Sequence, residues 1–308
     1  MTELKTIIVT GGDAKYYSYI QGLIASVKRF NFKNTAIGII DGGFLQEQKE
    51  QLERQGLNVI KPTWDSNYLK FKASMKEYLL VNLYKSRLDE LFPEYDIIIW
   101  LDGDTWLQTD CAINYLKQVA LTGKLAVVSQ ASRLQKQHMA LRRKWFWLAE
   151  PRSILFKNAR RANLGKDLCW SLAARPTLNA GVYALLREAP HWQAWKNWQK
   201  ICRQRGRIFS SDQLSMALAV YYDGLPYEAL PDICNYMGPW RYDTKRKIFT
   251  DLYVPYDPVS VVHLAGIEKK FGPIEKVSVI TETGETLKLS LAYEDWLKRE
   301  NYPEALSC

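Results

Sequence analysis

The sequence is poor in cysteine and histidine, the residues that cross-link small secreted folds or bind structural metal ions. Its 308 residues include five cysteines and three histidines, and no two cysteines form a C-x-x-C pair. Neither a disulfide framework nor a structural zinc site is therefore predicted. No apolar run approaches the roughly 18 residues of a membrane span, and the chain starts without a signal-peptide core. We therefore expect a protein of the reducing cytoplasm.

Internal repeats, low-complexity linkers and a glycine-rich phosphate loop are also absent. The loop after the first predicted strand reads TGGDAKYY, with neither a G-x-G-x-x-G nor a P-loop pattern. That absence disfavours a nucleotidyltransferase on a related fold. The composition, 47% hydrophobic and 24% charged, is that of a globular protein. We predict a single domain over residues 1–308.

Apolar segments that resemble buried strands alternate with amphipathic segments. Strands without period-2 alternation favour parallel pairing, with helices on both faces of the sheet. We therefore predict an α/β fold with a mixed, mainly parallel central sheet, ligands binding at the carboxyl ends of its strands. The predicted strands are 4–10, 35–41, 95–102, 124–130 and 177–187, and the predicted helices are about 16–30, 45–55, 72–92, 190–204 and 211–222. A strand-to-loop transition at 258–266, a hairpin at 277–291 and a helix near 292–300 complete the prediction.

The net charge of +9 comes from one segment. Residues 132–176 carry eleven Lys or Arg against two acidic residues, an excess equal to that of the whole chain. This basic segment also holds Trp, Phe and Leu, a mixture suited to an anionic membrane surface. The alternative is a partly solvated helical lid whose aromatic residues pack on the domain. Nucleic-acid binding is not expected, because no binding motif accompanies the charge.

Two aspartates crowd the end of the apolar stretch IIIWLDGD. Extended residues two apart point to the same side, so Asp102 and Asp104 aim at one place, and Gly103 leaves room for a ligand. Adjacent like charges are unfavourable without a cation. A hard divalent ion held by carboxylates and substrate phosphates resolves the conflict. For this tripeptide alone, a solvated turn with helix-capping aspartates is the alternative.

Three later motifs contain chemistry of the same kind. His263 opens HLAGIEKKF and suits Mn²⁺ better than Mg²⁺ as a third ligand, although a histidine on an apolar strand is often a core residue. Asp212 and Gln213 begin a helix, where an aspartate also serves as a cap. Asn179 precedes Ala-Gly and has an amide for a sugar hydroxyl, although such an Asn is also common in turns.

The order D-x-D, N-A-G, D-Q, H-x-x-G-x-x-K resembles the GT-A fold glycosyltransferases. It is most similar to family 8, which includes glycogenin and bacterial lipopolysaccharide galactosyl- and glucosyltransferases. The resemblance implies that Asp102, Asp104 and His263 bind Mn²⁺, with Mg²⁺ as the other candidate, and that Gly266 and Lys269 contact the diphosphate of a UDP-hexose. The sequence departs from the family pattern at Lys270 and Phe271, where proline and tryptophan are usual. It also departs at Gln130, where relatives often carry an acidic residue.

The same resemblance implies further donor contacts. Thr10, Asp13 and either Tyr16 or Tyr17 match the nucleotide loop, with Asp13 for the base edge and a tyrosine for stacking. Lys85 and Arg87 match the basic position before the D-x-D strand, with Arg87 preferred as the sugar or phosphate contact. Neither the basic segment 132–176 nor the C-terminal part 272–308 belongs to the family core.

The implied reaction is transfer of a hexose to a glycan, a lipid-linked molecule or another hydroxyl acceptor, with retention. Asn179, Asp212 and Gln213 would be catalytic: Gln213 lies below the anomeric carbon, and Asp212 holds hydroxyls or, in an inverting enzyme, acts as acid–base carboxylate. A glycosidase is disfavoured because its two carboxylates stand about 5 Å or more apart across a sugar. A non-catalytic basic membrane- or partner-binding protein on a transferase scaffold is the other alternative. The sequence leaves the oligomeric state open and favours a cytoplasmic location, with peripheral contact at the inner face of the membrane.

Overall fold

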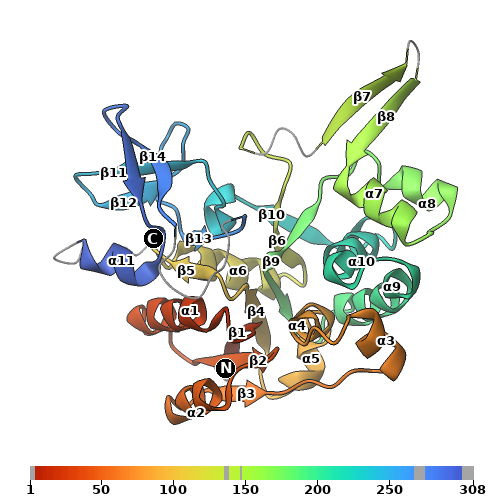
Figure 1. Cartoon of the computed structure of the whole chain (residues 1–308), viewed down its shortest axis with the longest axis horizontal. Helices are drawn as coiled ribbons and strands as arrows, with labels where there is room; N and C mark the ends of the chain where they lie inside the picture. The colour runs from red at the N-terminus through yellow and green to blue at the C-terminus, as the bar shows by residue number, and fades with distance from the viewer. Residues whose placement is uncertain (1–3, 135–138, 146–147, 267–274, 300–308) are drawn as a thin grey trace.

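The computed structural model describes residues 4–134, 139–145, 148–266 and 275–299. Its largest element is a seven-stranded sheet of order β10-β6-β9-β4-β1-β2-β3. Neighbouring strands are parallel except at β9, which runs antiparallel to β4 and β6. The predicted mixed, mainly parallel sheet is therefore confirmed (Figure 1). The strands are β1 (Thr6–Gly12), β2 (Thr35–Asp41), β3 (Asn58–Ile60), β4 (Ile97–Leu101), β6 (Leu125–Ser129), β9 (Leu178–Leu186) and β10 (Tyr227–Leu230).

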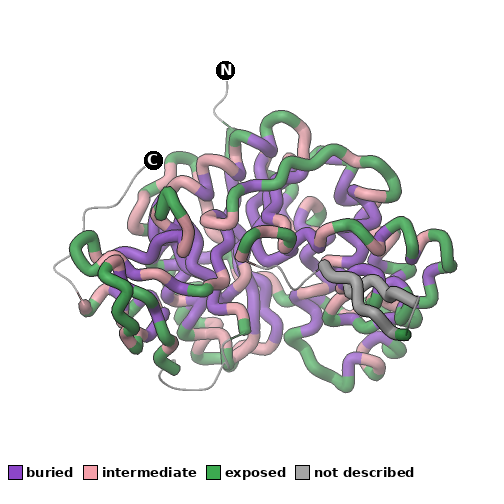
Figure 2. The backbone as a smooth tube through the Cα atoms, turned by 90° about the horizontal axis from the view of Figure 1, so that it is seen from above, coloured by how far each residue is buried: buried purple, intermediate pink, exposed green. Residues whose placement is uncertain are grey.

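Helices cover both faces of this sheet because its central strand is apolar on both sides. Successive residues of β4 alternate between two clusters: Ile98 and Trp100 lie in one, and Ile97, Ile99 and Leu101 in the other. All five residues are buried. Figure 2 shows that buried backbone fills the middle of the molecule and that exposed residues gather at its periphery. The first cluster includes residues of α4 (Tyr78–Tyr84), α9 (His191–Arg205) and α10 (Ser211–Tyr221); the second includes residues of α1 (Tyr17–Arg29) and α6 (Cys111–Leu121). α2 (Gln46–Arg54) connects β2 with β3.

A smaller β region packs beside the sheet. β5 (Thr105–Leu107) follows the D-x-D loop and pairs antiparallel with β13 (Val261–His263). The predicted C-terminal hairpin is present, as β14 (Val277–Thr281) and β15 (Thr286–Leu289). It joins β11 (Trp240–Asp243) and β12 (Ile248–Thr250) in a four-stranded sheet. Trp106 of β5 packs against Trp296 of α11 (Tyr293–Lys298), with ring centroids 5.0 Å apart, so aromatic packing attaches this region to the sheet domain.

The single long helix predicted at 72–92 is wrong. The chain forms α3 (Asn67–Lys72), α4 and α5 (Leu88–Leu91) instead. Ser74 and Met75 adopt positive φ angles of 51° and 56°, a left-handed conformation that ends a right-handed helix. Local propensity favours a continuous helix here, but the chain must turn twice to pack Leu69 and Leu80 into the same cluster.

The predicted helical insertion is also partly wrong. Residues 132–176 contain a two-stranded hairpin, β7 (Met139–Trp145) and β8 (Leu148–Ser153), before the short helices α7 (Ile154–Arg161) and α8 (Lys166–Ser171). Figure 1 shows the hairpin projecting from the domain. The segment therefore contains a β-hairpin as well as helices, and its helices follow the hairpin.

Cysteine use differs from the expectation at one position. Cys111 is disulfide-bonded, whereas Cys169, Cys202 and Cys234 are free and buried. Within the described ranges, no helix is both long enough and apolar enough to cross a membrane.

Candidate functional site

Three predicted metal ligands converge at the junction of the two β regions. Asp102 and Asp104 flank the turn between β4 and β5, and His263 ends β13, the strand paired with β5. His263 Nε2 lies 3.3 Å from Asp104 Oδ1 and 3.9 Å from Asp102 Oδ2. One ligand atom from each residue falls within 4.8 Å of the other two. The β5–β13 pairing therefore brings together ligands that are 159 positions apart between Asp104 and His263.

Asp102 is oriented by contacts to its Oδ1 oxygen. Lys85 Nζ lies 2.6 Å from Asp102 Oδ1, and the indole N–H of Trp100 donates to the same oxygen at 2.8 Å. Asp102 Oδ2 is the oxygen nearer His263. Since Oδ1 is already bonded to two donors, Oδ2 is the oxygen placed to bind a cation.

His263 is oriented by a residue that the sequence analysis did not single out. His263 Nδ1 and Asn235 Oδ1 are 2.6 Å apart, and both residues are buried. A carboxamide oxygen only accepts, so this contact requires the proton of His263 on Nδ1, which leaves the lone pair of Nε2 directed toward the two aspartates. The stretch DICNYMG shows no motif that would have identified Asn235.

Gly181 of β9 forms one wall of the cluster. A Cβ at this position would meet His263 Cε1 at 2.8 Å and Asp102 Oδ2 at 2.9 Å. Only a glycine allows the backbone to approach both ligands so closely. Two carboxylates and an imidazole nitrogen form a donor set that suits Mn²⁺, so the residues present fit the implied metal.

The predicted catalytic residues differ in how many of their polar atoms already have hydrogen-bond or ion-pair partners. Asp212 is buried and lies with Oδ2 3.6 Å from Lys85 Nζ and 3.3 Å from Asn82 Nδ2, while its Oδ1 has no hydrogen-bond partner among the described residues. Burial raises the pKa of Asp212, and Lys85 opposes the increase. Asn179 Oδ1 accepts from the Gly181 amide at 2.8 Å, and Gln213 is half-buried in the first turn of α10.

Lys85 connects these two groups of residues. Its ammonium is buried between Asp102 and Asp212, donates to the Ala180 carbonyl at 3.2 Å, and has a pKa that burial lowers but the two carboxylates raise overall. Arg87, the residue preferred from the resemblance, lies elsewhere: it pairs with Asp65 at 2.8 Å and Glu90 at 2.9 Å. The structure brings Lys85 to the acidic cluster and leaves Arg87 in a separate ion-pair network.

Tyr16, rather than Tyr17, faces the cluster from the predicted nucleotide loop. Burial raises the pKa of Tyr16, and the charges of Asp104, Asp102 and Asp13 raise it further. Tyr17 instead donates to Gln51. Asp13 Oδ1 accepts from the Lys15 amide at 3.0 Å.

Four other predicted contacts are placed as follows. Thr10 is buried within β1, and its hydroxyl has no hydrogen-bond partner among the described residues. A Cβ on Gly103 would meet Gly11 O at 2.8 Å, so this glycine allows the turn after β4 to pack against β1. Gly266 has a φ of +78° and open space around it, and Lys269 lies outside the described residues.

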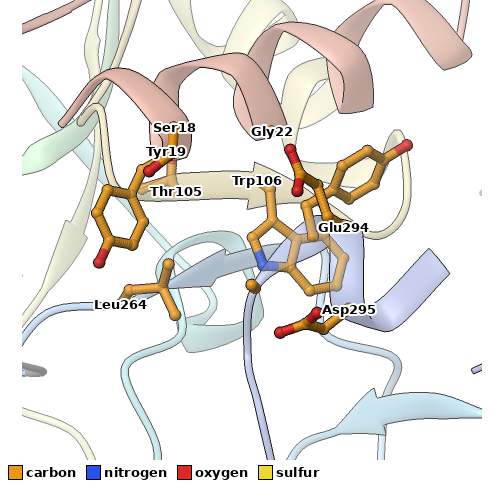
Figure 3. Close-up of a pocket in the computed structure, with 10 residues that line it drawn as sticks. Ser18, Tyr19, Gly22, Thr105, Trp106, Leu264, Glu294 and Asp295 are labelled. Atoms are coloured by element: carbon orange, nitrogen blue, oxygen red, sulfur yellow. The ribbon is translucent and has the colours of Figure 1, made fainter. Parts of the chain in front are cut away.

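A cavity of about 390 Å³ adjoins the cluster (Figure 3). Thr105 and Leu264, which follow Asp104 and His263 in sequence, both line it. Tyr19 lines it too, and the pKa of Tyr19 is raised by burial and by the charge of Asp104. Glu294 and Asp295 of α11 complete its far side.

Comparison with known proteins extends the resemblance. Residues 7–153 match the model of Glycosyl transferase family 8, and no curated protein matches the chain. Among solved structures, the WbbM bifunctional glycosyltransferase in its apo form is 16% identical with a TM-score of 0.54, covering 98% of this chain and 51% of its own. The galactosyltransferase LgtC, solved with donor and acceptor sugar analogues, is 12% identical with a TM-score of 0.50, covering 84% and 87%. The chain spans about half of the first of these. The fold is that of the GT-A glycosyltransferases.

Proposed function

Since residues 7–153 match the model of Glycosyl transferase family 8, we propose that the protein moves a hexose from a UDP-sugar to a hydroxyl acceptor. The proposed reaction depends on Mn²⁺ and retains the configuration of the sugar. The observation that supports it best is the convergence of Asp102, Asp104 and His263 within 4.8 Å.

Asp102 Oδ2, Asp104 Oδ1 and His263 Nε2 would hold the cation. When bound, the ion supplies a Lewis acid that neutralises the charge developing on the departing diphosphate. The protein orients the ligands before substrate binds: Lys85 and Trp100 fix Asp102, and the Gly181 backbone leaves space beside it. Such preorganised charge needs no rearrangement during the reaction.

Asp212 and Lys85 would act on the sugar side of the site. Asp212 Oδ1 is buried and unpaired within the described part of the chain, so it can accept a hydrogen bond from a donor-sugar hydroxyl. Lys85 keeps Asp212 close to Asp102 and offsets both charges. Gln213 and Asn179 would provide further polar contacts, and Tyr16 would stack on the uracil ring.

The decisive experiment measures release of UDP from a panel of UDP-hexoses, with GDP-, ADP- and CMP-sugars as comparison. We expect Mn²⁺-dependent UDP release by the wild type and at least about 100-fold less by Asp104→Ala and His263→Ala, because each removes a metal ligand. Unchanged far-UV circular dichroism would show that both variants fold. Metal-dependent turnover that persists in Asp104→Ala would disprove the metal assignment.

We also propose that the acceptor is lipid-linked and is reached at the cytoplasmic face of an anionic membrane. Apolar side chains are exposed at Trp145, Trp170, Phe71 and Phe209. Lys72 donates to the Arg203 and Gln204 carbonyls, which holds α3 against the end of α9. Residues 196–209 contain five Lys or Arg and no acidic residue. Aromatic side chains among basic ones favour an anionic lipid surface.

Vesicle co-sedimentation tests this location. We expect binding to vesicles that contain phosphatidylserine, weaker binding by Trp145→Ala/Trp170→Ala, and none to pure phosphatidylcholine. Val254→Ala, which removes an equally exposed apolar side chain near the small sheet, is the matched control. Equal binding to both kinds of vesicle would disprove an electrostatic membrane contact.

A further inference from the structure

We propose that Asn235 is a positioning residue for the metal site, acting through His263. The proposal rests on the metal-dependent function above and assigns a role to a residue outside the predicted ligand set. Asn235 ends η3 (Asp232–Asn235), a short 3₁₀ helix, whereas His263 ends β13, 28 residues later.

Backbone hydrogen bonds hold the two residues in register. The Tyr236 amide donates to the Val261 carbonyl at 2.9 Å, and the His263 amide donates back to the Tyr236 carbonyl at 2.9 Å. The Ser260 amide donates to Ile233 O at 2.9 Å. Asn235 therefore moves with the strand that carries His263, and the 2.6 Å contact between Oδ1 and Nδ1 belongs to a rigid unit.

The contact selects one of two tautomers of His263. With the proton on Nδ1, Nε2 presents its lone pair toward Asp104 and Asp102. Without an acceptor at Nδ1, the proton can move to Nε2, which lies 3.3 Å from Asp104 Oδ1. His263 would then donate to Asp104, and this hydrogen bond would occupy both atoms that a cation needs.

The other atom of the Asn235 amide supports this role. Asn235 Nδ2 is buried and has no hydrogen-bond partner among the described residues. An amide placed for general structural reasons normally has both ends paired when buried. Here only the oxygen is used, and it is used by a metal ligand. The reverse orientation of the amide would donate from Nδ2 to Nδ1 and put the histidine proton on Nε2, so the two orientations predict opposite metal affinities.

Binding of Mn²⁺ alone, followed by calorimetry and by the electron paramagnetic resonance of free Mn²⁺, tests the proposal on the full chain. Asn235→Leu keeps the approximate volume but removes the acceptor, and we expect it to weaken binding by about 10- to 100-fold. Asn235→Asp keeps an acceptor at Nδ1, and we expect it to bind Mn²⁺ at least as well as the wild type. Gln108→Met removes another buried amide, bonded to the Phe249 and Val259 backbone and not to a ligand; we expect lower stability and unchanged Mn²⁺ affinity.

The outcomes separate this inference from the function on which it rests. Wild-type Mn²⁺ binding that Asn235→Leu leaves unchanged overturns the role of Asn235 but not the metal site. A tenfold loss in Asn235→Asp also overturns it, and this variant decides the question if Asn235→Leu does not fold. A wild type that binds no Mn²⁺ overturns both. Mn²⁺ binding with the expected variant pattern, but without UDP release from any sugar, supports Asn235 and overturns the proposed reaction.

Discussion

Lys85 is a buried cation that lies between two carboxylates. Its ammonium is fully buried, 2.6 Å from Asp102 and 3.6 Å from Asp212. A buried charge is tolerated when paired, and removing one partner leaves the other uncompensated. The local sequence VNLYKSRLDE does not reveal which basic residue will be buried, because Lys85 and Arg87 both read as residues of a surface helix.

We predict that Lys85→Met lowers the free energy of unfolding by about 3–5 kcal/mol, the usual result of breaking a buried ion pair. Equilibrium urea denaturation measures the change. Adding Mn²⁺ should recover part of it, since a cation beside Asp102 replaces the lost positive charge. Lys124→Met, at an exposed ion pair with Glu228, serves as control and should change stability by less than about 1 kcal/mol. A Lys85→Met variant as stable as the wild type would contradict the buried-pair account.

Asp212 allows a prediction of pH dependence. Burial raises its pKa above the ordinary value of 3.8, so the folded protein binds this proton more tightly than the unfolded chain. The stability contributed by the proton is complete below the unfolded pKa and is lost as the pH rises through the folded pKa. The amide of Asp212→Asn has no such proton to release, so this variant does not lose that stability as the pH rises. We therefore expect the free energy of unfolding of Asp212→Asn, relative to wild type, to increase from about pH 4 upward; urea titrations at several pH values measure it, and parallel curves would contradict it.

At the scale of elements, β9 positions two residues of the candidate site and runs antiparallel to both of its neighbours in the sheet. It lies between β4 and β6 and brings Asn179 and Gly181 to the cluster. The motif N-A-G predicted close backbone approach, and the structure identifies the partners as His263 and Asp102.

We predict that Gly181→Ala weakens Mn²⁺ binding by about tenfold or more, because a Cβ placed 2.8 Å from His263 Cε1 must displace the ligands. Calorimetric titration with Mn²⁺ measures the affinity. Gly165→Ala, at a position with open space, should leave it unchanged. Wild-type affinity in Gly181→Ala would show that the strand yields without moving the ligands.

At the scale of the whole molecule, the reactivity of the free cysteines tests whether the core is closed to solvent. Burial raises the pKa of Cys202 and Cys234 to about 12, and both side chains are almost inaccessible. We expect neither to react with a thiol reagent at about pH 8 in the native protein, and both to react in urea, because the thiolate is the reactive form. Peptide mapping by mass spectrometry locates the label. Native labelling of either residue would indicate opening of the core around α9 or η3.

The features of the fold and the site that the sequence predicts are those that depend on local interactions. The alternation of apolar strands and helices, the carboxyl-end loops and the pair Asp102–Asp104 depend on neighbours in sequence, and the structure bears out the fold class. The break at Ser74 and Met75 could not be predicted, because packing of Leu69 and Leu80 overrides helix propensity there. Nor could the hairpin at β7 and β8, since a basic, aromatic-rich segment carries both strand and helix patterns.

By itself, the sequence determined the α/β architecture and the adjacent pair Asp102–Asp104, because strand burial and the D-x-D spacing act over a few residues. Only the tertiary structure decided which groups surround these two carboxylates. Strand pairing and burial between distant segments bring Lys85 to the site instead of Arg87, and Tyr16 instead of Tyr17. They also place Asn235 behind His263. A charge or a tautomer is set by what lies within a few ångströms in space, and sequence order does not contain that distance.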